Sequence, residues 1–175
     1  MRATERKRRP FMTPAKWIWM VSAALLTFLI WLGLYYRDIQ LPHWSAEAEA
    51  KQRIVATGEI SNVERLNKHI WDETVWVGFG AGEQDDYHYV FLRSDETTLT
   101  VDASDVLGED ELKAQFRSSK PGTNIVRVQA GLFRGAPAWE IYYSAASDGG
   151  VQYFYDFYTF DKDGKLIDSY RLPSS

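Results

Sequence analysis

The chain has 175 residues, of which 45% are hydrophobic and 25% charged, and it contains no cysteine. Seven of its 20 Lys and Arg residues but only one of its 24 Asp and Glu residues lie in the first 37 positions, so 13 basic residues face 23 acidic ones in the remainder. This acidic remainder argues against nucleic-acid binding, which needs a basic face, and the lack of cysteine excludes disulfides, zinc–thiolate sites and thiol nucleophiles.

The first element is an uncharged run at 17–36, WIWMVSAALLTFLIWLGLYY. Twenty helical residues span about 30 Å, the thickness of the hydrocarbon layer, so the run predicts a transmembrane helix. Aromatic rings and basic side chains at both ends of a span are typical of the two membrane interfaces. The expected membrane-interface anchors are Lys16, Trp17, Trp19, Trp31, Tyr35, Tyr36 and Arg37.

The basic residues predict the orientation of this helix. Positions 1–16 form a basic tail expected to stay in the cytoplasm, which places the acidic C-terminal part outside the cell, on a single-pass membrane protein. A cleaved signal peptide is the alternative, because SAEAEA at 45–50 contains a small-residue cleavage pattern. Against it, the apolar run exceeds the usual length of about 7–15 residues and ends well before that pattern.

A second helix is expected over 43–57, after Leu41-Pro42 has ended the membrane helix and before Gly58 ends its successor. Its apolar stripe would include Trp44, Ala48, Gln52 and Val55 at near-helical spacing. Four runs with alternating apolar residues follow, around 63–67, 75–79, 87–91 and 99–101, and predict an antiparallel meander.

The same order of elements then recurs. Acidic residues 109–111 open a helix that Pro121-Gly122 ends, and strands are expected over 125–133, 138–143, 151–160 and 165–171. RLNKHIW at 65–71 aligns with RVQAGLF at 127–133, and the alignment continues by placing 75–77 on 139–141 and 87–91 on 151–155. The pattern therefore predicts an α+β fold with two copies of a module in which one helix covers a curled antiparallel sheet.

The residues at 139–143, WEIYY, and the aromatic strand that runs into DKDGK at 161–165 resemble the TseB-like cell-wall elongation regulators of Gram-positive bacteria. The resemblance covers nearly the whole chain. It implies two tandem cystatin-like modules, at 43–103 and 104–175, the second related to peptidase-propeptide (PepSY) modules. It also implies association with a monofunctional penicillin-binding transpeptidase, and it carries no catalytic motif.

The sequence predicts no metal, cofactor or catalytic site. His43, His69 and His88 lack the spacing that lets two imidazoles meet one metal ion, and no G-x-S-x-G, S-x-x-K or phosphate-loop pattern occurs. DKDGK is expected to be a hairpin turn, because the twelfth position of a calcium loop beginning at Asp161 would be Leu172 and not Glu.

The aromatic run YFYDFYTF at 153–160 is unusual, because a strand with one buried face should alternate aromatic and polar residues. Alternation places Tyr153, Tyr155 and Phe157 on one face and Phe154, Tyr158 and Phe160 on the other. Either the strand is covered on both sides, for instance by the other module, or one set of rings binds a partner, since tyrosine is enriched at interface hot spots. The candidate partner surface is Tyr153, Tyr155, Phe157 and Tyr158.

Three functions remain open from the sequence. The first is a non-catalytic, membrane-anchored regulator outside the cell that binds a cell-wall transpeptidase and modulates elongation. The second is a small-ligand sensor or an enzyme that uses a cavity between helix and sheet. The third is a protease-inhibitor or chaperone role by analogy with PepSY modules.

Overall fold

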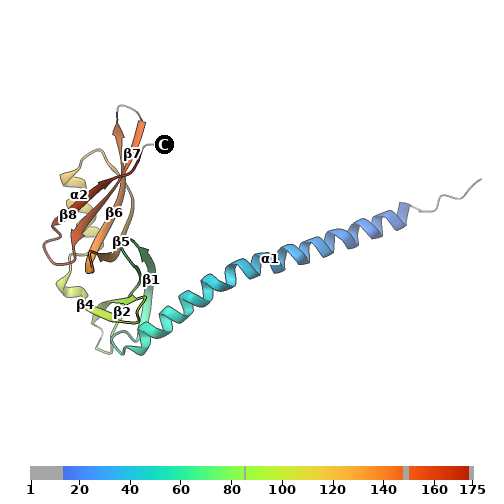
Figure 1. The fold of residues 1–175 in the computed structure, drawn as a ribbon, viewed down its shortest axis with the longest axis horizontal. Coiled ribbons are helices and arrows are strands. Elements are labelled where there is room, and N and C mark those ends of the chain that lie inside the picture. The colour runs from blue at the N-terminus through green and yellow to red at the C-terminus, as the bar shows by residue number, and fades with distance from the viewer. Residues whose placement is uncertain (1–13, 85, 148–149, 174–175) are drawn as a thin grey trace, which may run out of the picture. The chain divides into compact units, whose positions relative to one another are not determined.

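The computed structural model describes residues 14–84, 86–147 and 150–173. The chain divides into two compact units, a helical unit up to Ala46 and a β unit from Glu47 onward. Along the chain the elements are α1 (Pro14–Ala56), β1 (Asn62–Ile70), β2 (Thr74–Ala81), β3 (Tyr87–Arg93), β4 (Thr98–Asp102), the 3-10 turn η1 (Ala103–Asp105), α2 (Glu109–Ser119), β5 (Asn124–Phe133), β6 (Ala136–Ser147), β7 (Gly150–Thr159) and β8 (Leu166–Arg171) (Figure 1).

The helical unit contains a segment, Lys16–Tyr36, that is long and apolar enough to cross a membrane. All of its side chains are exposed, and the ring of Trp31 stacks on those of Phe28 and Tyr35. Each expected anchor from Lys16 to Tyr36 is exposed; Arg37 is among the residues whose side chains are not described, and most of the tail at 1–16 lies outside the described residues. The orientation of the helix across a membrane stays a prediction.

The expectation that Leu41-Pro42 ends the membrane helix is wrong, because α1 continues through it to Ala56. Proline removes one backbone donor and costs about 3 kcal/mol inside a helix. The residues that follow, SAEAEAKQRIVA, are mostly strong helix formers, which offset that cost. The helix ends two residues before Gly58, whose positive φ of 81° is the left-handed conformation common just past a helix.

The first sheet is an antiparallel meander in the order β1-β2-β3-β4, and the last turns of α1 cover one of its faces. Among the described side chains of α1, Ala50 and Ile54 are buried, whereas Ala48, Gln52 and Val55 are exposed, so the expected apolar stripe has the wrong phase. Gly78 of β2 permits the close approach, because a Cβ there would lie 3.0 Å from Ile54 Cδ1.

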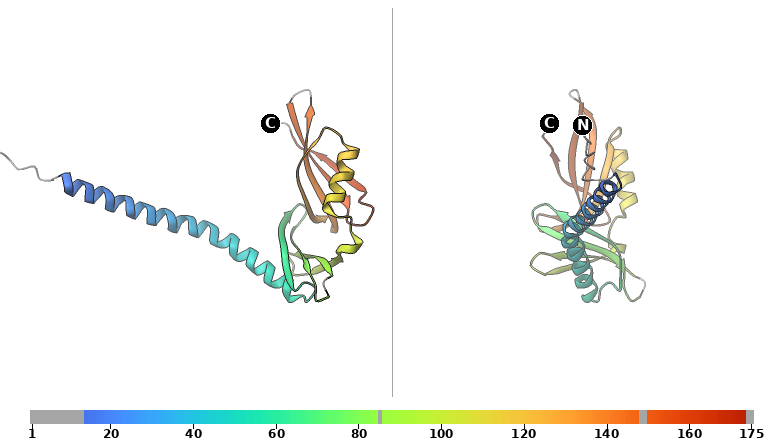
Figure 2. Two further views of the ribbon diagram at one scale, coloured as in Figure 1. Left: turned by 180° about the vertical axis from the view of Figure 1, so that it is seen from behind. Right: turned by 90° about the vertical axis from the view of Figure 1, so that its right-hand side faces the viewer.

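The second sheet repeats this arrangement in the order β5-β6-β7-β8, with α2 against one face (Figure 2). Leu112 and Phe116 are the buried residues of α2, as their spacing predicts, and the Glu111 side chain accepts a hydrogen bond from the Gly108 backbone N–H at the helix start. The α+β class and the two four-stranded meanders expected from the sequence are confirmed. The module boundaries 43–103 and 104–175 stay a prediction, since the β unit is one compact body.

The pairing of strands supports the internal duplication and corrects its alignment. Both β1 and β5 have a register shift, between Val63 and Arg65 and between Ile125 and Arg127, which are matched positions. However, Asn67 pairs with Val77 while its counterpart Gln129 pairs with Glu140. Val77 therefore corresponds to Glu140 and not to Ile141, and a carboxylate occupies in the second sheet the position of a buried valine in the first.

One apolar core joins the two sheets. Val75, Val77, Tyr89 and Phe91 lie on the face of the first sheet that α1 does not cover. They belong to the same cluster as α2 and the second-sheet residues Trp139, Ile141, Tyr143 and Tyr158. The far face of the second sheet, opposite α2, holds a separate cluster of Phe133, Ala138 and Phe157, with Trp71 packed against it.

Candidate partner-binding face

A row of three tyrosines and one arginine crosses the second sheet on the face opposite α2. Arg127 of β5 pairs with Tyr142 of β6, Tyr142 with Tyr155 of β7, and Tyr155 with Tyr170 of β8, so the row spans all four strands. We call these four residues the tyrosine row. The ring of Tyr142 stacks on that of Tyr155 at a centroid distance of 4.7 Å, and on that of Tyr153 at 5.6 Å.

Two of the four predicted partner-surface residues lie at this face and two are buried. Tyr153 is 40% exposed and Tyr155 is half-buried. Phe157 is 1% exposed because Phe133 stacks on it at 4.2 Å and Trp71 covers it. Tyr158 is buried on the opposite face, against Phe116. Phe157 and Tyr158 are therefore core residues, and the candidate surface is corrected to exclude them.

Sequence reasoning missed Tyr142, Tyr170 and Arg127. Tyr142 and Tyr170 lie in runs where alternation alone identifies the strand, but only the register between strands brings them beside Tyr155. The guanidinium carbon of Arg127 lies 5.9 Å from the centroid of the Tyr142 ring, within range of a cation–π contact. The matched arginine in β1, Arg65, contacts the Phe79 ring in the same way, at 4.4 Å.

A buried carboxylate lies beside the row, on the same face of the second sheet. Glu140 is 2% exposed, and its Oε1 accepts hydrogen bonds from Arg127 Nη2 at 2.8 Å and Gln129 Nε2 at 3.2 Å. Its Oε2 lies 3.1 Å from His69 Nε2, which belongs to β1 of the first sheet. Burial by itself would raise the pKa of Glu140, but the hydrogen bonds from His69 and Arg127 outweigh it and hold that pKa below its ordinary value.

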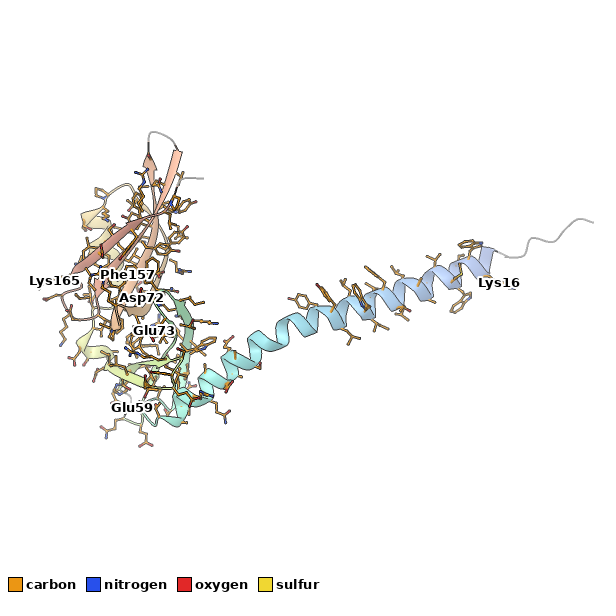
Figure 3. The ribbon with its side chains drawn as sticks, in the orientation of Figure 1. Lys16, Glu59, Asp72, Glu73, Phe157 and Lys165 are labelled. Atoms are coloured by element: carbon orange, nitrogen blue, oxygen red, sulfur yellow. The ribbon has the colours of Figure 1, made fainter. Side chains whose placement is uncertain are left out.

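His69 of β1 lies where the first sheet contacts the face of the second sheet that is opposite α2. Its side chain is 1% exposed, and a Cβ added to Gly131 of β5 would lie 2.3 Å from the His69 ring. Two further hydrogen bonds hold the same junction: Arg134 N donates to Asp72 Oδ2, and Arg93 donates to the carbonyl of Gly135. We call this set of contacts the joint. Asp72 and Glu73, in the turn after β1, lie near Phe157 in the view of Figure 3.

Replacing Gly131 by Ala is expected to lower the free energy of unfolding by about 1–3 kcal/mol, because the added methyl group overlaps the buried His69 ring. Urea unfolding of the full chain in detergent micelles, followed by circular dichroism, measures it. The control is the same substitution in a His69→Ala background, where the space is free. An equal loss in both backgrounds would contradict the close packing of the two residues.

A second buried carboxylate, Asp156, lies on the α2 side of the sheet and is fully buried. Its hydrogen-bond donors come from α2's C-cap and from three strands: Lys120 Nζ, Tyr143 OH, Tyr158 OH and Ser169 Oγ. Burial and the nearby Asp156 raise the pKa of Tyr158. Because four donors bond to one carboxylate, the arrangement links the end of α2 to the second sheet.

A hollow of about 510 Å³ lies at the start of α2. It is lined by Arg65, Phe79, Tyr89, Ala103 and residues 108–111. Two of its charged side chains pair with each other, Arg65 with Glu109 at 3.0 Å, and Glu109 also pairs with Lys113 at 2.6 Å. Burial raises the pKa of Tyr89.

Within the described residues, no group of three or more His, Asp and Glu side chains could hold a metal ion. His69 bonds to Glu140, His88 Nε2 lies 2.9 Å from Asp86 Oδ2, and the side chain of His43 is not described.

Fold and site together define a protein with an apolar N-terminal helix and two helix-covered antiparallel sheets, one of which carries a tyrosine-rich face. No protein-family model and no curated protein matches the chain. Among solved structures, the YpmB protein from Bacillus subtilis has a similar fold, with a TM-score of 0.58 and 20% identity. The match covers 74% of this chain and 97% of that one.

Proposed function

We propose that this protein is a non-catalytic, single-pass membrane protein whose β unit lies outside the cell and regulates cell-wall elongation. Its partner in this proposal is a membrane-bound wall-synthesis enzyme, a monofunctional penicillin-binding transpeptidase. The two sheets with their helices would then be tandem cystatin-like modules, the second related to PepSY. The observation that carries the proposal is the tyrosine row with Tyr153, an aromatic face that α2 leaves uncovered.

Three further observations support this role. The Lys16–Tyr36 segment would confine the protein to a bilayer and so raise its effective concentration for a partner in the same membrane. Tyr and Arg, which make up the row, are among the residue types enriched at the hot spots of protein interfaces. The four hydrogen-bond donors to the buried carboxylate of Asp156 all belong to the fold itself. Asp156 does not line the hollow at the start of α2.

A small-ligand sensor or enzyme is the second candidate, favoured by the hollow of about 510 Å³ at the start of α2. That volume is within the usual range for small-molecule sites, about 300–1,000 Å³. Arg65, the one cationic side chain among its lining residues, is already bonded to Glu109, which weakens its availability to a ligand.

In-membrane crosslinking of the tagged full-length protein tests the first proposal. We expect an elongation transpeptidase among the captured neighbours, and a recovery at least tenfold lower when Tyr153 and Tyr155 are both replaced by Ser. The control replaces Val151 and Leu166, which are 65% and 50% exposed, by Ser. If no wall-synthesis enzyme is enriched, the proposed partner is wrong. Unchanged recovery in the tyrosine variant would show that binding occurs elsewhere.

A further inference from the structure

The tyrosine row is continuous with the joint between the two sheets. Trp71, the residue directly after β1, places its ring 5.3 Å from the centroid of Tyr155 and 5.4 Å from that of Tyr170. It also meets Phe157 edge-on at 4.8 Å. A tryptophan of the first module therefore extends the aromatic surface of the second, and it keeps part of its own surface open to solvent.

Besides its ring contacts with Tyr155 and Tyr170, Trp71 is positioned by contacts of its chain neighbours that lie beside the row. His69, two residues earlier, is fixed by Glu140 and by close packing on Gly131. On the other side of Trp71, Asp72 accepts the hydrogen bond from the Arg134 backbone. Separation of the joint would therefore withdraw Trp71 and leave Phe157 uncovered, while the four residues of the row kept their pairing within the second sheet.

The chemistry of the face favours a protein as its occupant. Tyr142 has its ring faces against Tyr153 and Tyr155, so ring edges and hydroxyl groups make up much of the outer surface, whereas a sugar chain would need open ring faces. The charge of Arg127 is balanced by Glu140, so the face offers no excess of cations to an anionic polymer. Aromatic edges, hydroxyls and one guanidinium suit apolar side chains and backbone carbonyl groups.

We infer that the partner surface is composite: Trp71 of the first module completes it with Tyr155 and Tyr170 of the second, and it exists only while the joint is closed. The occupant is a protein, the membrane-bound partner of the proposed function, on which this inference rests. Glu140 links the two parts, since one of its oxygens bonds to His69 in the joint and the other to Arg127 in the row.

The test uses the full-length chain in its native membrane with a photoreactive phenylalanine at position 153, where the native tyrosine stacks on Tyr142 of the row. We expect an adduct with the wall-synthesis enzyme, and a yield at least tenfold lower with Trp71→Ala. Trp76→Ala is the matched control, because Trp76 packs on the α1 side of the first sheet and carries a cation–π contact with Lys68 there. An equal yield from the Trp71 variant overturns the composite surface.

A second pair of variants tests the role of the joint. His69 bonds to Glu140, which is not one of the four residues of the row, yet His69→Ala is expected to lower the adduct yield. Adding Asp72→Cys and Arg134→Cys to the His69→Ala variant should restore the yield under oxidising conditions only. The new cysteines can pair only with each other within the chain, because the chain has no other cysteine. Full yield from His69→Ala alone, or no recovery after oxidation of the pair, overturns the requirement for a closed joint.

The remaining outcomes separate this inference from the function on which it rests. If general crosslinking captures the enzyme but position 153 does not, the composite surface is wrong and the proposed function stands. If position 153 joins two copies of this chain, the face is a self-association surface and the inference is overturned. If no protein is captured by either route, both fail.

Discussion

Replacing Lys120 by Met should lower the free energy of unfolding by about 3–5 kcal/mol, because it leaves the fully buried carboxylate of Asp156 without a counter-charge. Burial by itself would lower the pKa of Lys120, but its hydrogen bonds to Asp156 and Tyr143 outweigh it and raise that pKa above the ordinary lysine value. The ammonium group is thus held in its charged form by the site. Urea unfolding of the full chain in detergent micelles at neutral pH is the measurement.

Lys113→Met, within α2, is the matched control. Lys113 pairs with Glu109 and Asp110 at the surface, where ion pairs contribute about 0–1 kcal/mol. The double variant Lys120→Met with Asp156→Asn should recover part of the loss, because no buried charge then remains. If Lys120→Met costs no more than Lys113→Met, the Lys120–Asp156 pair does not hold α2 to its sheet.

Replacing Glu140 by Gln is expected to cost about 1–3 kcal/mol at pH 7, because a buried charge-assisted hydrogen bond from Arg127 is weakened and the one from His69 is disturbed. The pKa of Glu140 in the folded state is below its ordinary value of 4.5. Its ionisation therefore stabilises the fold above about pH 4.5, and this contribution is lost as the pH falls through the lowered pKa.

Unfolding measured at pH 7, 5 and 3 should consequently show a gap between wild type and Glu140→Gln that is wide at pH 7 and narrow at pH 3. Glu64→Gln, an exposed position on β1, is the control and should show little difference at any of these pH values. A gap that is the same at pH 3 and pH 7 would mean that the carboxylate charge is not what stabilises the joint.

Most secondary structure of this chain can be predicted from local patterns. Alternating runs identify the strands best where they contribute buried residues to an apolar cluster, as β1 to β3 and β5 to β7 do. The acidic first turn followed by Leu112 and Phe116 identifies α2. Local signals failed at Pro42, where the helix continues because good helix formers follow. They also failed at Ala50 and Ile54, because the sheet, and not the helix, determines which side of α1 is covered.

The candidate site was less accessible to sequence reasoning. Glu140 lies between Trp139 and Ile141 and so looks like the exposed member of an alternating strand, yet it is buried because His69, 71 residues earlier, covers that face. Tyr153 and Tyr155 could be placed on one face by alternation. Their neighbours Tyr142 and Tyr170, and the burial of Phe157 under Trp71, depend on strand register and on the other sheet, which no local pattern contains.

The helix α1 supplies both the apolar segment and part of the core of the first sheet, which limits where the chain can be cut to give a soluble protein. Ala50 and Ile54 belong to the core of the first sheet although they lie on the same continuous helix as the apolar segment. Proteolytic shedding before Glu47 would leave that core intact, whereas a cut at Gly58 would strip the cover from Gly78 and Val90 and leave an aggregation-prone fragment. Expression trials of a secreted form should therefore begin no later than Glu47.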